Sequence, residues 1–217
     1  NLPFCAVYNL DEIGKAYETA GVALGNYLSG VSDSAAAKDT SKQNQFATAP
    51  YEIMRAQDIR AQQLPYNQQY FFVVSPKDTG RLNEYLALDL VKNNFPLESK
   101  FLYGAEVKPK DGKGDGYIPL YVVKTVAGGE KAPMDGSSVA ESFPGYDDKG
   151  KPSIKMNMTA LGAKKWGELT RNNVGRPVAI SLDDIVYSAP NVINAIEGGQ
   201  TEISGNFTIE EAQDLAN

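Results

Sequence analysis

The chain contains no histidine, and its 217 residues include a single cysteine, Cys5. Histidine is the commonest general base near neutral pH and the commonest metal ligand, so its absence removes the usual Ser-His and Cys-His catalytic pairs. Cys5 cannot form an intrachain disulfide, and the apolar, β-prone residues around it predict a buried thiol. We therefore expect no catalytic residues, no metal site and no cofactor, and we do not expect an enzyme.

The sequence also lacks long apolar runs and an excess of positive charge. No stretch reaches the roughly 18 consecutive apolar residues that a membrane-spanning helix needs. The chain begins without methionine and without a signal-peptide pattern, which predicts a piece of a longer protein. Its 21 basic and 27 acidic residues give a net charge of -6, so we expect no nucleic-acid partner.

What is present is a set of helix and strand patterns, beginning with a predicted strand over residues 2–8. Asn9 can cap a following helix, and Glu12 completes a capping box. The helix has one apolar stripe that we expect to be buried, formed by Ile13, Ala16, Tyr17, Ala20, Leu24, Tyr27 and Leu28. Residues 29–65 contain few apolar anchors and are predicted to be a linker or mobile segment.

Residues 66–125 are predicted to form an inserted βαββ lobe. Residues 69–75 form an apolar run of strand length, and Asp78 can cap the helix that follows, which we expect to extend toward Phe95 before Pro96 stops it. Two alternating segments then flank a glycine-rich tip that contains Lys108, Lys110 and Lys113, so they predict a hairpin with a solvated tip.

Residues 126–150 are rich in glycine and proline, and we predict a loop-rich connection with a short helical turn around residues 138–143. Residues 153–159 alternate apolar and polar side chains, as in a half-solvated strand, and Thr159 can cap the next helix. In that helix Trp166 is predicted to pack in the core. Gly162 and Gly167 predict close approach of the helix to a sheet, because glycine inside a helix costs about 1 kcal/mol relative to alanine.

The last part of the chain predicts a hairpin and one more strand. Residues 178–182 and 185–188 flank Asp183-Asp184, which must adopt positive φ in a two-residue turn. Adjacent carboxylates at a turn face water, so we expect no catalysis from them. Gly198-Gly199 precede a strand over residues 201–204, and Thr208 with Glu211 predicts a capped helix after it.

This order of elements resembles one known family. The runs Gly175-Arg176-Pro177-Val178-Ala179-Ile180 and Ile203-Ser204-Gly205-Asn206-Phe207-Thr208-Ile209-Glu210-Glu211-Ala212, with Ser188-Ala189-Pro190 between them, are similar to the first extracytoplasmic domain of SecD, in the form fused to SecF. The resemblance is closest over residues 151–216 and is colinear at residues 2–13. Asp184 departs from the family, which usually has Asp-Gly at this turn. The family's proton-carrying residues lie in membrane helices, and none of them is in this chain.

The resemblance implies an α+β fold with mixed, mostly antiparallel sheets and helices packed on one face. It makes residues 1–28 and 151–217 a SecD-like head core, with the base of the domain outside the chain. It also implies a periplasmic location on the bacterial inner membrane, held by spans outside this chain, and partners that include the translocating preprotein, SecF and the Sec channel. The head is expected to contact exported polypeptides while proton flow drives conformational change. Our candidate contact residues are Tyr187, Pro190, Asn191, Gly198, Gly199 and Gln200.

Two other functions stay open on sequence grounds. The first is a periplasmic or extracellular interaction module, or a lipoprotein domain, unrelated to export. The second is a hydrolase that uses the acidic pairs, which the missing histidine and the lack of converging polar residues disfavour.

Overall fold

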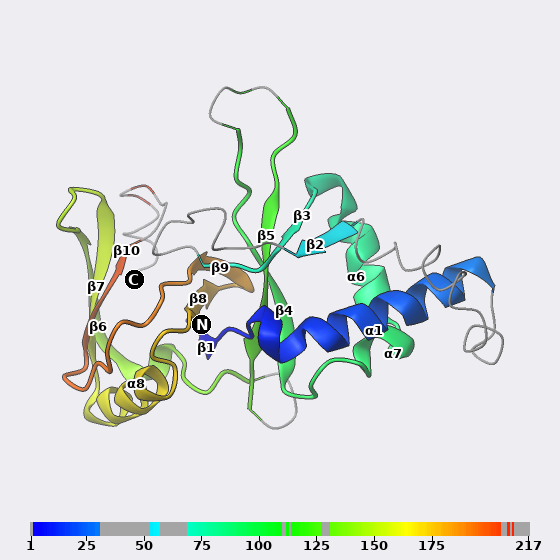
Figure 1. Cartoon of the computed structure of the whole chain (residues 1–217). Coiled ribbons are helices and arrows are strands. Elements are labelled where there is room, and N and C mark those ends of the chain that lie inside the picture. The colour runs from blue at the N-terminus through cyan, green and yellow to red at the C-terminus, as the bar shows by residue number, and fades with distance from the viewer. Residues whose placement is uncertain are drawn as a thin grey trace.

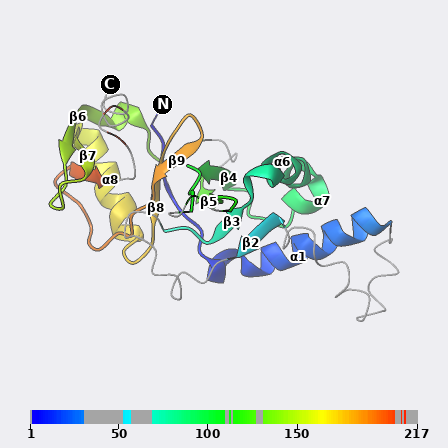
Figure 2. The same cartoon turned by 90° about the horizontal axis from the view of Figure 1, so that it is seen from above.

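The computed structural model describes residues 2–30, 53–56, 69–109, 112, 114–126, 131–204, 208 and 210. These residues form an α+β fold with two sheets, which lie side by side in both views (Figures 1 and 2). The larger sheet has seven strands, in spatial order β1 (Phe4–Ala6), β8 (Val178–Leu182), β9 (Ile185–Ser188), β4 (Ser99–Gly104), β5 (Ile118–Lys124), β3 (Phe72–Val74) and β2 (Met54–Ala56). The smaller sheet has the order β10 (Gln200–Ser204), β7 (Pro152–Met158) and β6 (Val139–Tyr146). All named strand pairs are antiparallel except β4 with β9, so the predicted mixed, mostly antiparallel fold is confirmed.

Helix α1 (Leu10–Ser29) begins where the sequence predicts. The Asn9 side chain accepts a hydrogen bond from the Glu12 amide at 2.9 Å, and Glu12 accepts from the Asn9 amide at 3.0 Å. Most of the predicted stripe is buried or half-buried against the larger sheet. Tyr27 and Leu28 are instead 58% and 49% exposed, because the end of α1 projects past the sheet (Figure 1).

The predicted βαββ order is present as β3, a helical stretch, β4 and β5. The helical stretch is not one helix reaching Phe95. Leu88 adopts an extended backbone and separates α6 (Thr79–Ala87) from α7 (Asp89–Lys92). A 3-10 turn, η1 (Pro76–Asp78), precedes α6, and the Asp78 side chain makes no capping hydrogen bond. The hairpin is confirmed, and beyond Gly104 it projects from the body as an arm that pairs Val107 with Tyr117 (Figure 1).

The larger sheet crosses the predicted boundary between the head core and the inserted lobe. β9 pairs in parallel with β4 through Tyr103–Ile185 and Gly104–Val186. Within the predicted linker, 29–65, residues 54–56 form strand β2, which the buried side chains of Ile53 and Met54 anchor while Arg55 and Ala56 are exposed. Whether residues 1–28 with 151–217, and residues 66–125, fold as separate units stays a prediction.

The segment given as a loop-rich connection, residues 126–150, contains strand β6, so this assignment is wrong for residues 139–146. The short helical turn falls earlier, at η2 (Gly136–Ser138). Pro144 and Gly145 look like a turn in sequence, but β6 lies at an edge of the smaller sheet, where proline needs no ladder partner for its missing N–H. Pairing with β7 supplies the long-range contact that forms the strand.

Helix α8 (Ala160–Asn172) covers the inner face of the smaller sheet. The Thr159 side chain caps it by accepting from the Gly162 amide at 3.0 Å, as predicted. Both internal glycines let the α8 backbone lie close to another segment. The neighbouring segments are connections between elements and not the sheet, so the predicted partner was wrong. A Cβ on Gly162 would clash with the carbonyl of Ser138, and one on Gly167 would contact Glu197.

Strands β1 and β8 form a wall between two hydrophobic cores. Because side chains alternate along a strand, Phe4 and Ile180 face one core while Cys5 and Ala179 face the other. The first core contains α1, α6, α7 and the larger sheet. The second core contains Trp166 of α8 and the inner face of the smaller sheet. The two regions share this wall, which is buried on both faces.

The Asp183-Asp184 turn joins β8 to β9 with φ values of 49° and 64°, so positive φ at both residues is confirmed. The predicted helix capped by Thr208 and Glu211 lies largely outside the described residues. Among the helices that the structure describes, none has the length and apolar character needed to cross a membrane.

Candidate functional site

A pocket of about 250 Å³ lies in the second region, between the wall strand β8 and strand β10. Val178 and Ile180 of β8 form one side, and Trp166 and Thr170 of α8 also line it. The remaining lining residues come from β10 and the segment before it: Pro190, Asn191, Val192, Ile193, Asn194, Ile196, Thr201, Glu202 and Ser204. The pocket is therefore mostly apolar, with a rim built by the β9–β10 connection.

Trp166 anchors the α8 side of this pocket. Its side chain is 3% exposed and packs edge-to-face on Phe4, with ring centroids 5.4 Å apart. The indole Nε1 is buried and has no hydrogen-bond partner within the part of the chain that the structure describes. Buried donors are almost always satisfied, so this unpaired N–H is an exception beside the pocket.

The connection that forms the rim is held at two points and is open between them. On one side Val192 accepts from the Gly175 amide at 2.8 Å and donates to Arg176 O at 3.0 Å. On the other side the Ile196 amide donates to Thr170 Oγ1 at 2.9 Å, and Glu197 pairs with Arg171. Ile193, between these points, is 67% exposed at the pocket. The rim is thus a fixed loop that presents an apolar side chain to solvent.

Strand β10 directs peptide groups toward the same pocket. The Met158 amide donates to Gly199 O at 2.7 Å, so the odd-numbered residues of this strand form the hydrogen-bonded pairs with β7. The even-numbered residues must then point away from β7. The bond from Ser188 Oγ to Ser204 O, at 2.9 Å, agrees with this alternation. The peptide groups of Gln200 and Glu202 are therefore directed outward, and β10 is an edge strand of its sheet.

Glu202 is the only charged residue among those that line the pocket. Its Oε1 accepts from the Ser153 hydroxyl at 2.6 Å, and no ion pair to it is found among the described residues. By the alternation along β10 its carboxylate lies on the face of the sheet that carries Lys155, so Glu202 lines the pocket from the strand edge rather than with its charge.

The six candidate contact residues do not gather at one place. Pro190 and Asn191 line the pocket, and Gln200 is exposed at the start of β10. Gly199 packs against Ala163 at the other end of α8, while Gly198 is exposed. Tyr187 is half-buried in a bulge of β9, where the register with β8 shifts by one residue. Whether any of the six contacts a polypeptide stays a prediction.

Sequence reasoning missed the residues that shape the pocket. Trp166 is in the core as predicted, yet it also lines the pocket, and no pattern in the helix indicates this second role. Ile193 and Ile196 lie in a segment that carries no strand or helix signal. The presence of these two isoleucines in a short connection is the sequence feature that indicates packing of this segment against the rest of the fold.

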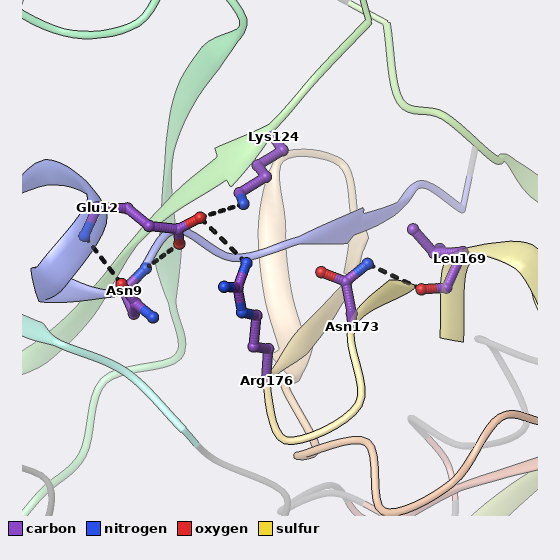
Figure 3. Close-up of polar contacts among 6 residues, drawn as sticks. All are labelled: Asn9, Glu12, Lys124, Leu169, Asn173 and Arg176. Atoms are coloured by element: carbon purple, nitrogen blue, oxygen red, sulfur yellow. Dashed lines mark hydrogen bonds and ion pairs between the residues drawn. The ribbon is translucent and has the colours of Figure 1, made fainter. Parts of the chain in front are cut away.

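A second polar cluster joins the two regions at the start of α1 (Figure 3). Glu12 Oε1 accepts from Lys124 Nζ of β5 at 2.5 Å and from Arg176 Nη1 at 3.2 Å. Partial burial raises the pKa of Glu12, but the bonds from Lys124 and Asn9 and the two nearby cations outweigh it, so the pKa is lowered overall. Nearby, the side-chain Nδ2 of Asn173 donates to Leu169 O at 2.8 Å and closes the end of α8. The bonds drawn in Figure 3 all join parts of the fold to one another, so we interpret this cluster as structural.

The two remaining residues with reactive side chains that the sequence singles out, Asp184 and Cys5, have structural surroundings. Asp184 pairs with Lys100 at 2.6 Å rather than facing water alone. Cys5 is buried as predicted, and burial raises its pKa to about 12, so the thiol is protonated at neutral pH. Both lie beside a more polar pocket of about 320 Å³ that also includes Lys131, Asp135 and Thr125. Among the described residues no group of three or more acidic, cysteine or histidine side chains could hold a metal ion.

Comparison with known proteins assigns the family. Residues 110–217 match the family described as SecDF, P1 head subdomain. The chain is 31% identical over 201 residues to the protein translocase subunit SecD of Rhodothermus marinus, covering 92% of this chain and 31% of that protein. It is 36% identical over 146 residues to SecD of Calditerrivibrio nitroreducens, covering 64% of this chain and 27% of that protein. The chain belongs to the SecD/SecDF family of protein translocase subunits.

The chain spans about a third or less of the length of these relatives. A solved structure described as "Structure and function of a membrane component SecDF that enhances protein export" is 19% identical, with a TM-score of 0.39, covering all of this chain and 91% of that one.

Proposed function

We propose that this chain is the extracytoplasmic head of a SecD-type accessory subunit and that it contacts polypeptides during export. The family assignment supports a role in the Sec system. The observation that carries contact with a polypeptide is the pairing of an apolar pocket with an open strand edge. Main-chain hydrogen bonding along such an edge binds extended chains with little dependence on sequence, as a factor that handles many exported proteins requires.

In this proposal the chain acts by binding and by movement, with no catalytic step and no cofactor. Membrane spans outside the chain hold it on the periplasmic face of the inner membrane. SecF and the Sec channel are its partners through the full-length protein. Proton flow through the membrane part changes the position of the head, so that a bound segment is kept from slipping back.

Site-specific crosslinking in the full-length, membrane-integrated protein tests this function. A photoreactive residue is placed at Asn191, Gln200 or Tyr187, and an exported protein is stalled part-way through the membrane. The matched control is Lys92, which is exposed on α7 far from the pocket. We expect labelling at Asn191 and Gln200 above that at Lys92. Equal labelling at all positions would favour an interaction module unrelated to export.

A further inference from the structure

The pocket and the outward edge of β10 together form a groove. We infer that this groove takes an extended segment that pairs its backbone with Gln200 and Glu202, inserts one aliphatic side chain beside Trp166, and places a lysine or arginine against Glu202. The inference rests on the proposed function, because it names the class of polypeptide that the site selects.

The backbone part follows from the ladder of the smaller sheet. Gln200 and Glu202, two residues apart, direct their peptide groups outward. An added strand directs its own N–H and C=O groups to one side at the same two-residue interval, so it can bond to both. Ser204 O is already bonded to Ser188. Among the described residues no other main-chain group bonds to Gln200 or Glu202 on this side, so the open part of the edge is short and lies directly against the pocket.

The aliphatic part follows from the side-chain alternation. On β10, Thr201 and Ile203 face the inner side of the sheet, where they pair with Met156 and Ile154 of β7. An added strand in register sends every second side chain to the same inner side, which is where the pocket lies. An apolar cavity of about 150 Å³ can hold a benzene ring, so a pocket of about 250 Å³ has room for one such side chain.

The charge part follows from Glu202. Its side chain faces the outer side of the sheet, opposite the pocket, together with Lys155. On the added strand, the residue next to the inserted one points to the outer side. Its side chain therefore lies near the Glu202 carboxylate. Lys155 lies across from Glu202 on that face but no ion pair joins them among the described residues, so the carboxylate can accept from a basic side chain, and the net charge of -6 on the chain also favours basic over acidic segments.

The single tryptophan makes occupancy directly measurable. Trp166 is the only tryptophan in the chain and lines the pocket, so its emission reports on a ligand that enters. The probe is the peptide Ac-Gly-Ser-Val-Lys-Ile-Lys-Val-Ser-Gly-amide, which absorbs no light where tryptophan does. We expect saturable binding with a shift in Trp166 emission. Absence of a shift for this peptide would overturn the inference.

Peptide variants separate the three contributions without changing the protein. Consecutive N–H groups of a strand point to opposite edges, so N-methylation of the two lysines blocks one edge and N-methylation of valine and isoleucine blocks the other. We expect one set, and not the other, to weaken binding about tenfold, from two lost hydrogen bonds. Serine in place of isoleucine should remove the emission shift, and glutamate in place of lysine should weaken binding. Equal effects of the two N-methylated sets would contradict strand pairing.

Protein variants provide the matching test. Gln200→Pro removes an outward N–H but no ladder bond to β7, whereas Gln200→Ala keeps it. We expect Gln200→Pro to weaken peptide binding roughly fivefold, from one lost hydrogen bond, and Gln200→Ala to have no effect. Glu202→Gln should reduce the preference for lysine over glutamate peptides. A far-ultraviolet spectrum matching the parent chain confirms folding of each variant.

Failure of the inference is distinguishable from failure of the proposed function. If exported chains crosslink to the head but the peptide does not shift Trp166 emission, the function stands and this groove is not its site. If the peptide binds as described but no exported chain crosslinks, the groove is an extended-peptide site and the export role falls.

Discussion

The two regions on either side of the β1–β8 wall differ in how completely they are closed. The first region buries a large set of aromatic and aliphatic side chains, and two of its buried tyrosines have hydrogen-bond partners: Tyr17 donates to Met54 O, and the Tyr70 and Tyr117 hydroxyls bond at 2.7 Å. The second region has a smaller core, an unpaired indole N–H at Trp166 and a strand edge beside a pocket. The more polar pocket of about 320 Å³ borders the first core at Cys5 and includes Thr125 Oγ1, which is unpaired among the described residues, so the regions differ in the apolar lining and the strand edge of the second one rather than in filling alone. The apolar pocket and the strand edge are the reasons for which we propose the contact site in the second region.

The largest effect that tests this division comes from neighbouring residues of β1. Phe4→Ala removes the ring that packs on Trp166, and a buried phenylalanine truncation costs about 3 to 5 kcal/mol. Cys5→Ala changes the first core by one small group and is expected to cost about 1 kcal/mol. Urea unfolding of both variants, followed by Trp166 fluorescence and by helical circular dichroism, measures these losses of stability.

If the shared wall couples the regions, both signals of Phe4→Ala shift together to lower urea. Two separate transitions, with the fluorescence change first, would show that the second region unfolds by itself. That result would count against the predicted head core as one folding unit, because α1 belongs to that unit but packs in the first region.

A pair of helix glycines gives the next effect. Gly162→Ala in α8 would drive a Cβ into the Ser138 carbonyl, so we expect a loss of about 3 kcal/mol through displacement of the helix. Gly14→Ala in α1 meets no atom within 4 Å and should stabilise the chain by about 0.5 to 1 kcal/mol. Thermal unfolding compares them. Equal effects would contradict the close approach of α8 to η2.

The Glu12 cluster connects the two regions and gives a smaller, pH-dependent effect. Glu12→Gln keeps a side-chain acceptor for the Asn9 amide but removes the charge that Lys124 and Arg176 face. We expect a loss of about 1 kcal/mol at neutral pH, since the carboxylate is only partly exposed.

The sign of the pH dependence follows from the lowered pKa of Glu12 in the folded chain. The stabilisation is fully present above the ordinary pKa of a glutamate and is lost as the pH falls through the lowered folded value. The parent chain and Glu12→Gln should therefore converge in acid. A constant difference across this range would show that Lys124 and Arg176 do not stabilise the carboxylate.

Local signals predicted much of this fold. The Asn9 and Thr159 caps, the Asp183-Asp184 turn and the burial of Trp166 each depend on a few adjacent residues, and all are observed. The family resemblance rested on the same local order. Strand β6 was missed because Pro144 and Gly145 indicate a turn locally, and only pairing with β7 makes the segment a strand.

The pocket could not be predicted for a related reason. It is formed by Ile180, Trp166 and Ile193, which come from three elements, and no pattern along the chain relates their positions. The candidate set was instead chosen for exposed backbone near glycine and proline. That criterion selected Pro190 and Asn191, which line the pocket, together with Gly198 and Gly199, which do not.

The smallest predicted effect lies at the turn between β8 and β9, on the wall itself. Asp184 has φ of 64° and pairs with Lys100 across exposed surface. Asp184→Gly removes the cost of positive φ and the ion pair together, so these changes nearly cancel, within about 0.5 kcal/mol. Asp184→Asn removes the ion pair but tolerates the same backbone less well than glycine. The glycine variant should thus be more stable than the asparagine variant by about 0.5 to 1 kcal/mol, at low and high salt alike. An asparagine variant at least as stable as the glycine variant in chemical denaturation would mean that this turn carries no backbone strain.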